Sequence, residues 1–441
     1  MIIYRDSNPI EALEMTNNVL IDSGLRALVA SLLIFSAVNA VAQIDALSLE
    51  SAPVEVVEET DPSSSTKLFV EGAVGNAIQR HGASQVDIGR ISLDLTYSRR
   101  VGTGMRLFFS DRLDIVRPKG MSANGTVNSL REAYLSWQPT GSTVVFDIGR
   151  INLRNGPAYG YNPTDFFRDG SLRILTSADP FVLRQNRIGS VMARGQKIWD
   201  GGSLSFAYSP KLSTRPGTDG WSLDLGSTNN RDRVLVTLGT RLSESLNSQV
   251  FLYKEESLPT SIGANLTALL SDAATGHLEW THGREPELLS RAVAMAPLRE
   301  ATRSRFAGGV TYTTLGKTSI TAEYQYNGFG LDKSAWNGLT VTPGAQLAYL
   351  REALRRQELA PRQAFLLYLT QKDIWLKDLD LTAYLRVNLE DRSKLAWFEL
   401  RRHWANFDLS LQLQQNIGGA NSEFGVLADR RLIQVLGTFY F

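Results

Sequence analysis

The chain has 441 residues, with 46 Lys and Arg against 45 Asp and Glu, so its formal charge at neutral pH is only +1. This balance argues against a protein that binds nucleic acid through bulk positive charge, and we expect no nucleic-acid partner. The absence of cysteine excludes disulfides, thiol nucleophiles, zinc–thiolate sites and iron–sulfur clusters. A hydrophobic content of 43% and a charged content of 21% are ordinary for a globular protein and unlike those of a helical membrane protein.

The N-terminal region has the features of a secretory leader. An apolar stretch from Leu25 to Val38, roughly 14 residues long, is too short to span a bilayer comfortably. Ala40 and Ala42 follow it and supply the small-x-small pattern that signal peptidase requires. We therefore expect residues 1–42 to be a leader cleaved after Ala42, with an uncleaved membrane anchor as the alternative. The candidate start residues are Met1 and Met15.

Residues 43–66 have a different composition and are predicted to form a flexible, acidic periplasmic arm. They contain no Lys or Arg, and Pro and Ser are frequent, as in solvated segments that cannot form a core. A plain spacer is the simpler interpretation, and docking of a basic periplasmic partner is the alternative. The acidic residues are Asp45, Glu50, Glu55, Glu58, Glu59 and Asp61.

Residues 67–441 show a two-residue alternation of apolar and polar side chains, which is typical of strands with one polar face. The alternation is clearest over residues 91–98, 379–390 and 407–414. A soluble β-sandwich would produce the same alternation, with its apolar face turned into a core. The face pattern alone therefore does not place the chain in a membrane.

The lengths of the connections discriminate better between these folds. We count about 18 strands, an even number as membrane barrels require, with about 14 or 16 as alternatives. Every second connection is short, as periplasmic turns are, and the long connections all fall on the other side. The long ones are predicted at residues 115–127, 152–186, 210–231, 283–304, 327–362 and 415–429. The predicted fold class is all-β, a transmembrane antiparallel β-barrel with short periplasmic turns and long outer loops.

The last strand carries the most specific signal in the chain. The sequence stops at Phe441, with Phe439, Val435 and Ile433 on the same face. This resembles the terminal strand of Gram-negative outer-membrane barrels, in which the final aromatic residue is read by the barrel-assembly machinery. The resemblance implies an outer-membrane location, an assembly signal at Phe439 and Phe441, and contact with outer-membrane lipid and lipopolysaccharide.

The most distinctive internal motif lies at the start of the second long outer connection. It reads Asp147-Ile148-Gly149-Arg150, then Gly156-Pro157, then Tyr161-Asn162-Pro163-Thr164-Asp165. It resembles the Gly-Arg strand end and Asn-Pro-x-Asp loop of porin-like barrels in the broad group that contains alginate-export proteins, although the usual Trp-Gly after Gly-Arg is missing. Because Asn162 precedes Pro163 and Asp165 can cap a turn, we expect a rigid loop that folds into the lumen.

This connection is also strongly basic. From Arg150 to Lys197, eight basic residues stand against three acidic ones, a net charge of +5. Folded into the lumen, as in many porins, it would form a positive constriction suited to carboxylates or phosphates. The alternative is that these arginines pair with acids across the lumen or bind lipopolysaccharide phosphates. The predicted constriction residues are Arg150, Arg154, Asp165, Arg168, Arg173 and Arg187, with Asn162 and Pro163 as structural positions.

Another long connection, residues 327–362, is predicted to contain a short helix with leucines at helical spacing and arginines beside them. We favour an external cap over a lid for this helix. Its leucines are Leu347, Leu350 and Leu354, and its arginines are Arg351, Arg355 and Arg356.

Polar inward positions and a strand number near 18 predict a wet lumen, and therefore a channel for small hydrophilic, anionic solutes without enzyme activity or cofactor. The alternatives are a polysaccharide export pore with a periplasmic partner at residues 43–66, an outer-membrane hydrolase, and a non-conducting scaffold. A metal site is not expected, because His277 and Glu279 share a strand face whereas His282 points the other way.

Overall fold

A computed structural model describes residues 64–80, 85–117, 125–295, 297–342 and 344–441. The predicted leader and most of the predicted acidic arm lie outside these residues. The described residues form one antiparallel sheet of 18 strands, which closes because β1 pairs with both β2 and β18. The predicted all-β barrel and its strand number are confirmed. Ser64–Thr66, assigned to the arm by composition, belong to β1, where they pair with the end of β2.

The strands occupy the following residues. They are β1 (Ser64–Gln79), β2 (Gln85–Arg100), β3 (Met105–Arg117), β4 (Thr126–Trp137), β5 (Val144–Ile151), β6 (Ser190–Trp199), β7 (Gly202–Ser209), β8 (Arg233–Ser243), β9 (Leu246–Glu255), β10 (Ser261–Ser271), β11 (Ala274–Pro286), β12 (Glu300–Thr313), β13 (Thr318–Asn327), β14 (Gln363–Gln371), β15 (Leu379–Asn388), β16 (Lys394–His403), β17 (Phe407–Ile417) and β18 (Asp429–Tyr440).

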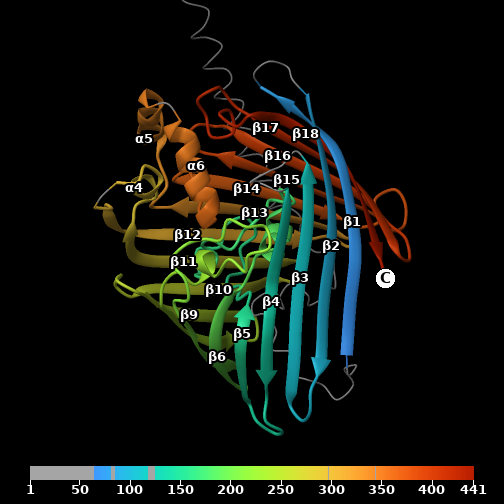
Figure 1. Ribbon diagram of the computed structural model, residues 1–441, viewed down its shortest axis with the longest axis vertical. Helices are drawn as coiled ribbons and strands as arrows, with labels where there is room; N and C mark the ends of the chain where they lie inside the picture. The colour runs from blue at the N-terminus through green and yellow to red at the C-terminus, as the bar shows by residue number, and fades with distance from the viewer. Residues whose placement is uncertain (1–63, 81–84, 118–124, 296, 343) are drawn as a thin grey trace, which may run out of the picture. The chain divides into compact units, whose positions relative to one another are not determined.

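Short helices lie in the outer connections. Helices α4, α5 and α6 lie beside one another (Figure 1) and pack through Leu288, Trp336 and Tyr349. No helix within the described ranges is long and apolar enough to cross a bilayer. The helices are α2 (Pro180–Gln185), α3 (Leu225–Thr228), α4 (Leu288–Ala292), α5 (Lys333–Gly338), the 3₁₀ helix η3 (Leu339–Val341) and α6 (Ala345–Arg356).

The alternating sequence pattern separates an apolar outer wall from a polar inner wall. On β2, Ile91 and Leu93 are 60% and 44% exposed, whereas Ser92 and Asp94 between them are 0% and 3% exposed. An apolar band on the outside of a closed sheet, with every backbone group paired, is what a bilayer requires of a spanning β-protein. The barrel is therefore an outer-membrane protein.

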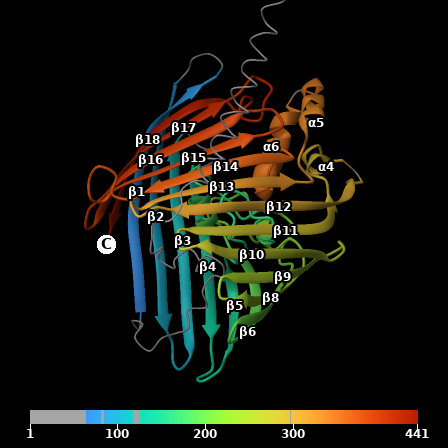
Figure 2. The same cartoon turned by 180° about the vertical axis from the view of Figure 1, so that it is seen from behind.

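The long connections all lie at one end of the barrel, as predicted, although the outer connections at residues 256–260 and 389–393 are also short. The end of the barrel that carries the short turns, such as residues 200–201 and 272–273, is the periplasmic end, and the long connections lie at the outer end. The longest two outer connections are residues 152–189, named loop L3 here, and residues 328–362. Figures 1 and 2 show L3, drawn in green, inside the ring of strands.

L3 fills one side of the lumen with apolar packing. Phe167 is buried against inward side chains of β6 to β9, among them Met192, Leu235 and Phe251. Phe166 stacks on Tyr253 of β9 with ring centroids 4.6 Å apart. This half of the barrel is therefore packed with side chains, and the two cavities described below lie on the side formed by β1 to β4 and β14 to β18.

The C-terminal residues lie on the outer wall beside the seam where the barrel closes. Phe439 and Phe441 are 46% and 72% exposed, and their rings make an edge contact with centroids 5.0 Å apart. The backbone N–H of Phe441 donates to the carbonyl of Leu68 on β1 (3.0 Å). Both rings of the predicted assembly signal thus face outward from the barrel.

We expect deletion of Phe441 to reduce the amount of assembled barrel in cells severalfold, while the purified variant refolds in detergent as the full chain does. The reason is that the deletion removes an exposed ring and only one backbone hydrogen bond out of a continuous ladder. The measurement is the fraction of barrel with heat-modifiable mobility on gels. An equal loss in cells and in detergent would contradict a recognition role.

Candidate functional site

L3 is fixed to strands β11 and β13 of the barrel wall by two buried glutamates. Glu279 on β11 accepts hydrogen bonds from the backbone N–H of Ala158 (2.7 Å) and from the hydroxyl of Thr164 (2.8 Å). Glu323 on β13 accepts one from the backbone N–H of Tyr159 (2.6 Å). Both carboxylates are fully buried, and a buried carboxylate is costly without such donors. L3 is therefore held inside the lumen by the wall itself.

The predicted structural positions Asn162 and Pro163 lie at this anchor. The Asn162 side-chain amide donates to the carbonyl of Ala158 (2.6 Å) and to Glu279 (3.0 Å). The carbonyls of Asn162 and Pro163 both accept hydrogen bonds from the guanidinium of Arg168. The Asn-Pro motif thus turns the loop back on itself and presents it to the wall carboxylate.

Asp165 and Arg187 form an ion pair inside L3. Arg187 Nη1 lies 2.5 Å from Asp165 Oδ2, and Arg184 Nε lies 3.3 Å from the same oxygen. Burial acts to raise the pKa of the Asp165 carboxyl, but the guanidiniums of Arg187 and Arg184 outweigh it and hold that pKa below its usual range. The charge of Arg187 is therefore neutralised by Asp165 within L3.

Arg168 also forms an ion pair, with a residue of another outer connection. Its Nη2 lies 2.6 Å from Glu358 Oε1, just beyond the end of α6, and Arg305 on β12 reaches the same oxygen at 3.3 Å. The hydroxyl of Tyr161 donates to the other oxygen of Glu358 (2.6 Å). One buried carboxylate thus joins L3, β12 and the connection that follows α6.

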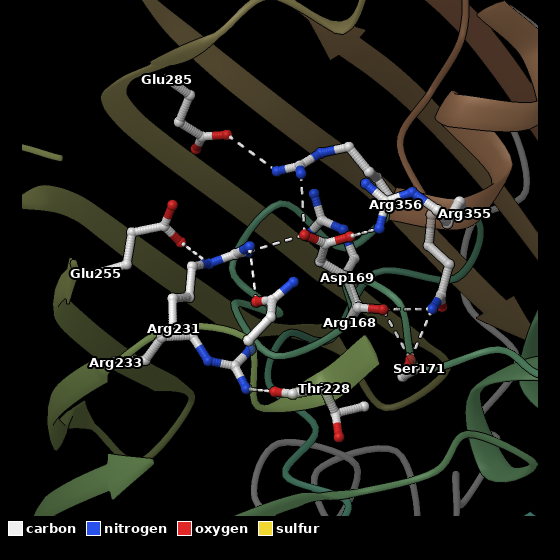
Figure 3. A network of polar contacts seen from close by, with 12 residues as sticks. Arg168, Asp169, Ser171, Thr228, Arg231, Arg233, Glu255, Glu285, Arg355 and Arg356 are labelled. Carbon is white, nitrogen blue, oxygen red and sulfur yellow. Dashed lines mark hydrogen bonds and ion pairs between the residues drawn. The ribbon is translucent and has the colours of Figure 1, made fainter. Parts of the chain in front are cut away.

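A second junction between L3 and α6 surrounds Asp169 (Figure 3). Its carboxylate accepts hydrogen bonds from Arg231 (2.8 Å), Arg356 (2.9 Å) and Arg355 (3.1 Å). Arg231 lies in the connection just before β8, and the two other arginines lie at the end of α6. Burial acts to raise the pKa of Asp169, but these guanidiniums dominate and place it well below its usual range. The predicted helix exists, and its C-terminal end is part of the L3 assembly rather than a separate external cap.

Arg150 and Arg173 are held mainly by backbone carbonyls. Arg150 on β5 donates to the carbonyls of Leu130 (3.1 Å) and Leu223 (2.6 Å). Arg173 donates to several carbonyls, including that of Ser222 (2.7 Å), and its Nε lies 3.9 Å from Asp224. Arg150 thus fastens the connection between β7 and β8 to the wall, and Arg173 fastens it to L3.

Open space remains as two cavities on the side of β1 to β4 and β14 to β18. The upper cavity, about 740 Å³, is lined toward the outer end by residues such as Ala73, Gln357 and Phe424. The lower cavity, about 560 Å³, is lined toward the periplasmic end by residues such as Lys67 and Tyr440. Both volumes suit small solutes and not folded proteins.

Among the six predicted constriction residues, Arg154 differs from the others. It lines the lower cavity, and within the described residues it makes no hydrogen bond or ion pair, although its charge interacts at longer range with Glu132 of the same cavity. Lys67, at the periplasmic end of β1, lines the same cavity and is likewise without such a partner in the described part of the chain. Arg154 and Lys67 are thus outside the ion-pair networks that hold L3.

The wall of the lower cavity carries further charges that are already paired. Arg112 on β3 contacts Glu71 (2.9 Å) and Asp94 (3.2 Å), and Arg131 on β4 contacts Asp94 (2.5 Å). Sequence reasoning missed these wall residues, although strand parity could have found some of them, since Asp94 lies on the polar face already recognised on β2. Nothing in the local sequence indicates that Glu279, Glu323 and Glu358 would receive L3.

Asp179 is the acid in L3 with the least charge compensation. It caps α2, accepting from the N–H of Phe181 (2.9 Å) and the hydroxyl of Tyr368 (3.2 Å), and it lines the lower cavity. Burial, with a smaller contribution from Glu399, raises the pKa of this carboxyl to about 6. Asp179 therefore titrates in a mildly acidic range.

The histidines follow the predicted strand faces. His277 faces inward, 3.1 Å from Glu323, whereas His282 faces outward and contacts Ser304 (2.9 Å). Within the described ranges no three His, Asp or Glu side chains are grouped as ligands of a metal ion.

The fold resembles solved outer-membrane porins. No protein-family model matches the chain, and no curated protein matches it in sequence. OccAB1 of Acinetobacter baumannii is similar in structure, with a TM-score of 0.55 and 10% identity over 89% of this chain and 99% of that one. OpdQ of Pseudomonas aeruginosa has a TM-score of 0.53 and 9% identity over 86% and 99%. OccK5 (OpdH) of the same organism has a TM-score of 0.50 and 11% identity over 86% and 98%. The similarity confirms the predicted porin-like fold.

We expect Glu279→Ala to release L3 from the wall. The substitution leaves several buried donors without an acceptor, at a cost of roughly 1–3 kcal/mol for each such group. The released loop should be cleaved by trypsin at its arginines much faster than in the wild type, at unchanged barrel content. Glu279→Gln keeps one acceptor oxygen and should show a smaller increase. Equal cleavage of the alanine variant and the wild type would contradict the anchoring role.

We expect the anion preference of the pore to rise as pH falls through about 6, because protonation of Asp179 removes one negative charge from the lower cavity. The folded-state pKa lies above the unfolded value of 3.8, so the folded barrel binds this proton more tightly and loses stability as the pH rises from about 3.8 to about 6. The reversal potential in a salt gradient, followed from about pH 7 to about pH 5, measures the change. Asp179→Asn should remove this step, and its persistence in that variant would assign the step elsewhere.

Proposed function

We propose that this barrel is an outer-membrane channel for small hydrophilic anions, selected electrostatically where L3 narrows the lumen. The observation that carries the proposal is Arg154, a guanidinium without a hydrogen-bonded or ion-paired partner in the described residues, at the wall of the lower cavity. Guanidinium groups favour carboxylates and phosphates, which they bind with paired, charge-assisted hydrogen bonds. Carboxylate and phosphate solutes are therefore the class to which we assign this channel.

The charge balance of the lower cavity supports this assignment. Its lining basic residues exceed its acidic residues by one, and Asp179 among the acids is neutral below about pH 6. Most members are paired with one another, which leaves the cations without partners to face the solute. The basic residues are Lys67, Arg90, Arg112, Arg131, Arg154 and Arg401, and the acidic residues are Glu71, Asp94, Glu132, Asp179 and Glu399.

The other predicted constriction residues contribute to selection mainly by shaping the pore. Arg168 and Arg187 are neutralised by Glu358 and Asp165, so their charges add little to the net field. Arg150 binds neutral carbonyls, so its charge adds a positive potential to the outer half of the pore, whereas the charge of Arg173 is partly offset by Asp224 at 3.9 Å. In this proposal an anion is attracted by these groups and contacts Arg154 and Lys67.

We expect Arg154→Gln to lower the anion preference and Lys67→Gln/Arg154→Gln to lower it further, with single-channel conductance at high salt nearly unchanged. The reason is that the substitutions remove cations facing the solute and leave the contacts that hold L3 intact. Reversal potentials of the purified protein in a planar bilayer under a KCl gradient measure the effect.

Arg215→Gln is the matched control, because Arg215 is exposed in the outer connection between β7 and β8 and lines neither cavity. Its reversal potential should equal that of the wild type. A double variant with the wild-type reversal potential would overturn the assignment of selectivity to Arg154 and Lys67.

A further inference from the structure

The two cavities meet at one level of the barrel. On β1, Glu71 lines only the lower cavity and Ala73, two residues further along, lines only the upper one. On β18, Gln434 lines only the upper cavity and Leu436 only the lower one. The residues that line both cavities lie at this boundary and are Arg90, Trp397, Gln412, Thr176 and Ser177.

Arg90 connects the barrel wall to L3 across this boundary. Its Nη1 donates to the carbonyl oxygen of Thr176 (2.7 Å), and its Nη2 lies 2.5 Å from Glu71 on the neighbouring strand β1. Its Nε is buried and has no hydrogen-bond partner among the described residues. The guanidinium is thus held by Glu71 of the wall and bridges to Thr176 of L3. Its Nε–H remains as an unused donor.

The remaining boundary residues are fixed by neighbours on their own side. Trp397 on β16 stacks on Tyr384 of β15 with ring centroids 5.6 Å apart. Gln412 on β17 donates to Glu399 of β16. Thr176 Oγ1 accepts from Asn186 within L3 (3.0 Å). Among the residues that line both cavities, Arg90 is therefore the wall side chain that donates to L3. Beside the boundary, Arg131 donates to the side chain of Asn186 (3.1 Å) and Tyr384 donates to the carbonyl of Ala178 (2.7 Å).

We propose that the Arg90–Thr176 contact closes the passage between the upper and lower cavities, and that a carboxylate or phosphate solute opens it by replacing the Thr176 carbonyl on the Arg90 guanidinium. The inference deepens the proposed function and rests on it for the class of solute. It assigns to Arg90 a role that the predicted constriction residues do not have. Solute recognition and opening then occur at the same guanidinium.

The exchange is favourable on general grounds. A guanidinium binds an anionic oxygen more strongly than a neutral carbonyl oxygen, and a carboxylate or phosphate can use two of its donors at once. Glu71 holds Nη2 throughout, so the side chain does not swing freely when Nη1 releases Thr176. The charged groups around the guanidinium are Glu71, Arg112 and Asp114, which lie on β1 and β3 and remain in place.

The test is the single-channel conductance of the full protein in a planar bilayer, first in potassium chloride and then with sodium acetate added as the probe anion. We expect Arg90→Gln to raise the chloride conductance roughly twofold or more, because an open passage replaces a bridged one. Acetate should raise the conductance of the wild type and leave that of Arg90→Gln unchanged.

Arg80→Gln is the matched control. Arg80, the residue that follows β1, also donates to backbone carbonyls, those of Asn416 on β17 (2.5 Å) and Phe424 in the connection after β17 (2.9 Å), but its own side chain lines neither cavity. Its conductance and its response to acetate should match those of the wild type. Arg90→Lys is the second variant, because it keeps the charge beside Glu71 and cannot bridge to Thr176 with a planar fork.

An Arg90→Lys or Arg90→Gln channel with wild-type conductance, in barrels of normal heat-modifiable mobility, overturns the closure. A wild-type channel that is indifferent to acetate overturns the displacement by anions. Failure of the proposed function is seen separately in the reversal potential of Arg90→Lys, which retains the positive charge. If Arg90→Lys conducts more than the wild type but shows no anion preference, anion selection is refuted, whereas the proposal that Arg90 closes the passage still holds.

Discussion

The arrangement of this pore depends on two carboxylates buried in the barrel wall. Neither Glu279 nor Glu323 forms an ion pair with a guanidinium within the described residues, and the backbone amides of L3 supply half of their recorded hydrogen bonds. Leaving either carboxylate without donors in the barrel interior would cost more than ordering the loop segment that supplies them. The loop is therefore drawn to β11 and β13, and the open space is displaced to the opposite side. Both cavities owe their position to this single constraint.

Burial also decides which charges can act on a solute. A guanidinium that leaves water must be paired, and the arginines in L3 and at the end of β5 satisfy this requirement in different ways. Arg187 pairs within the loop, Arg168 pairs with Glu358, and Arg150 binds carbonyls. The net charge of the segment, read from the sequence, therefore overstates the charge available in the pore. Structural arginines fix the loop, and a few cations without partners in the described residues remain for recognition.

How far the sequence predicts the molecule follows from the range of each interaction. The alternation over residues 91–98 and the short turns are local, so strand number, strand faces and sidedness could be predicted. The site residues were found because a motif and a charge excess are visible along the chain. Their partners were not, since Arg168 and Glu358 are 190 positions apart and nothing near either one indicates the other. The same alternation could have placed Arg90 on the lumen side, because it shares the polar face of Ser92 and Asp94.

The attachments of L3 differ in strength, which bears on how the pore can move. At β11 and β13 the loop is held by several buried hydrogen bonds, and at β6 to β9 by packed rings such as Phe167 and Phe251. Toward β2 the recorded attachment at the boundary of the cavities is the bond from Arg90, and it borders open space on both sides. Breaking it exposes no buried donor to an apolar surrounding, because the space on either side can admit water or an anion. Movement of the loop thus costs the least free energy at the Arg90–Thr176 contact, where the solute must pass. The rest of L3 can remain fixed while this contact opens.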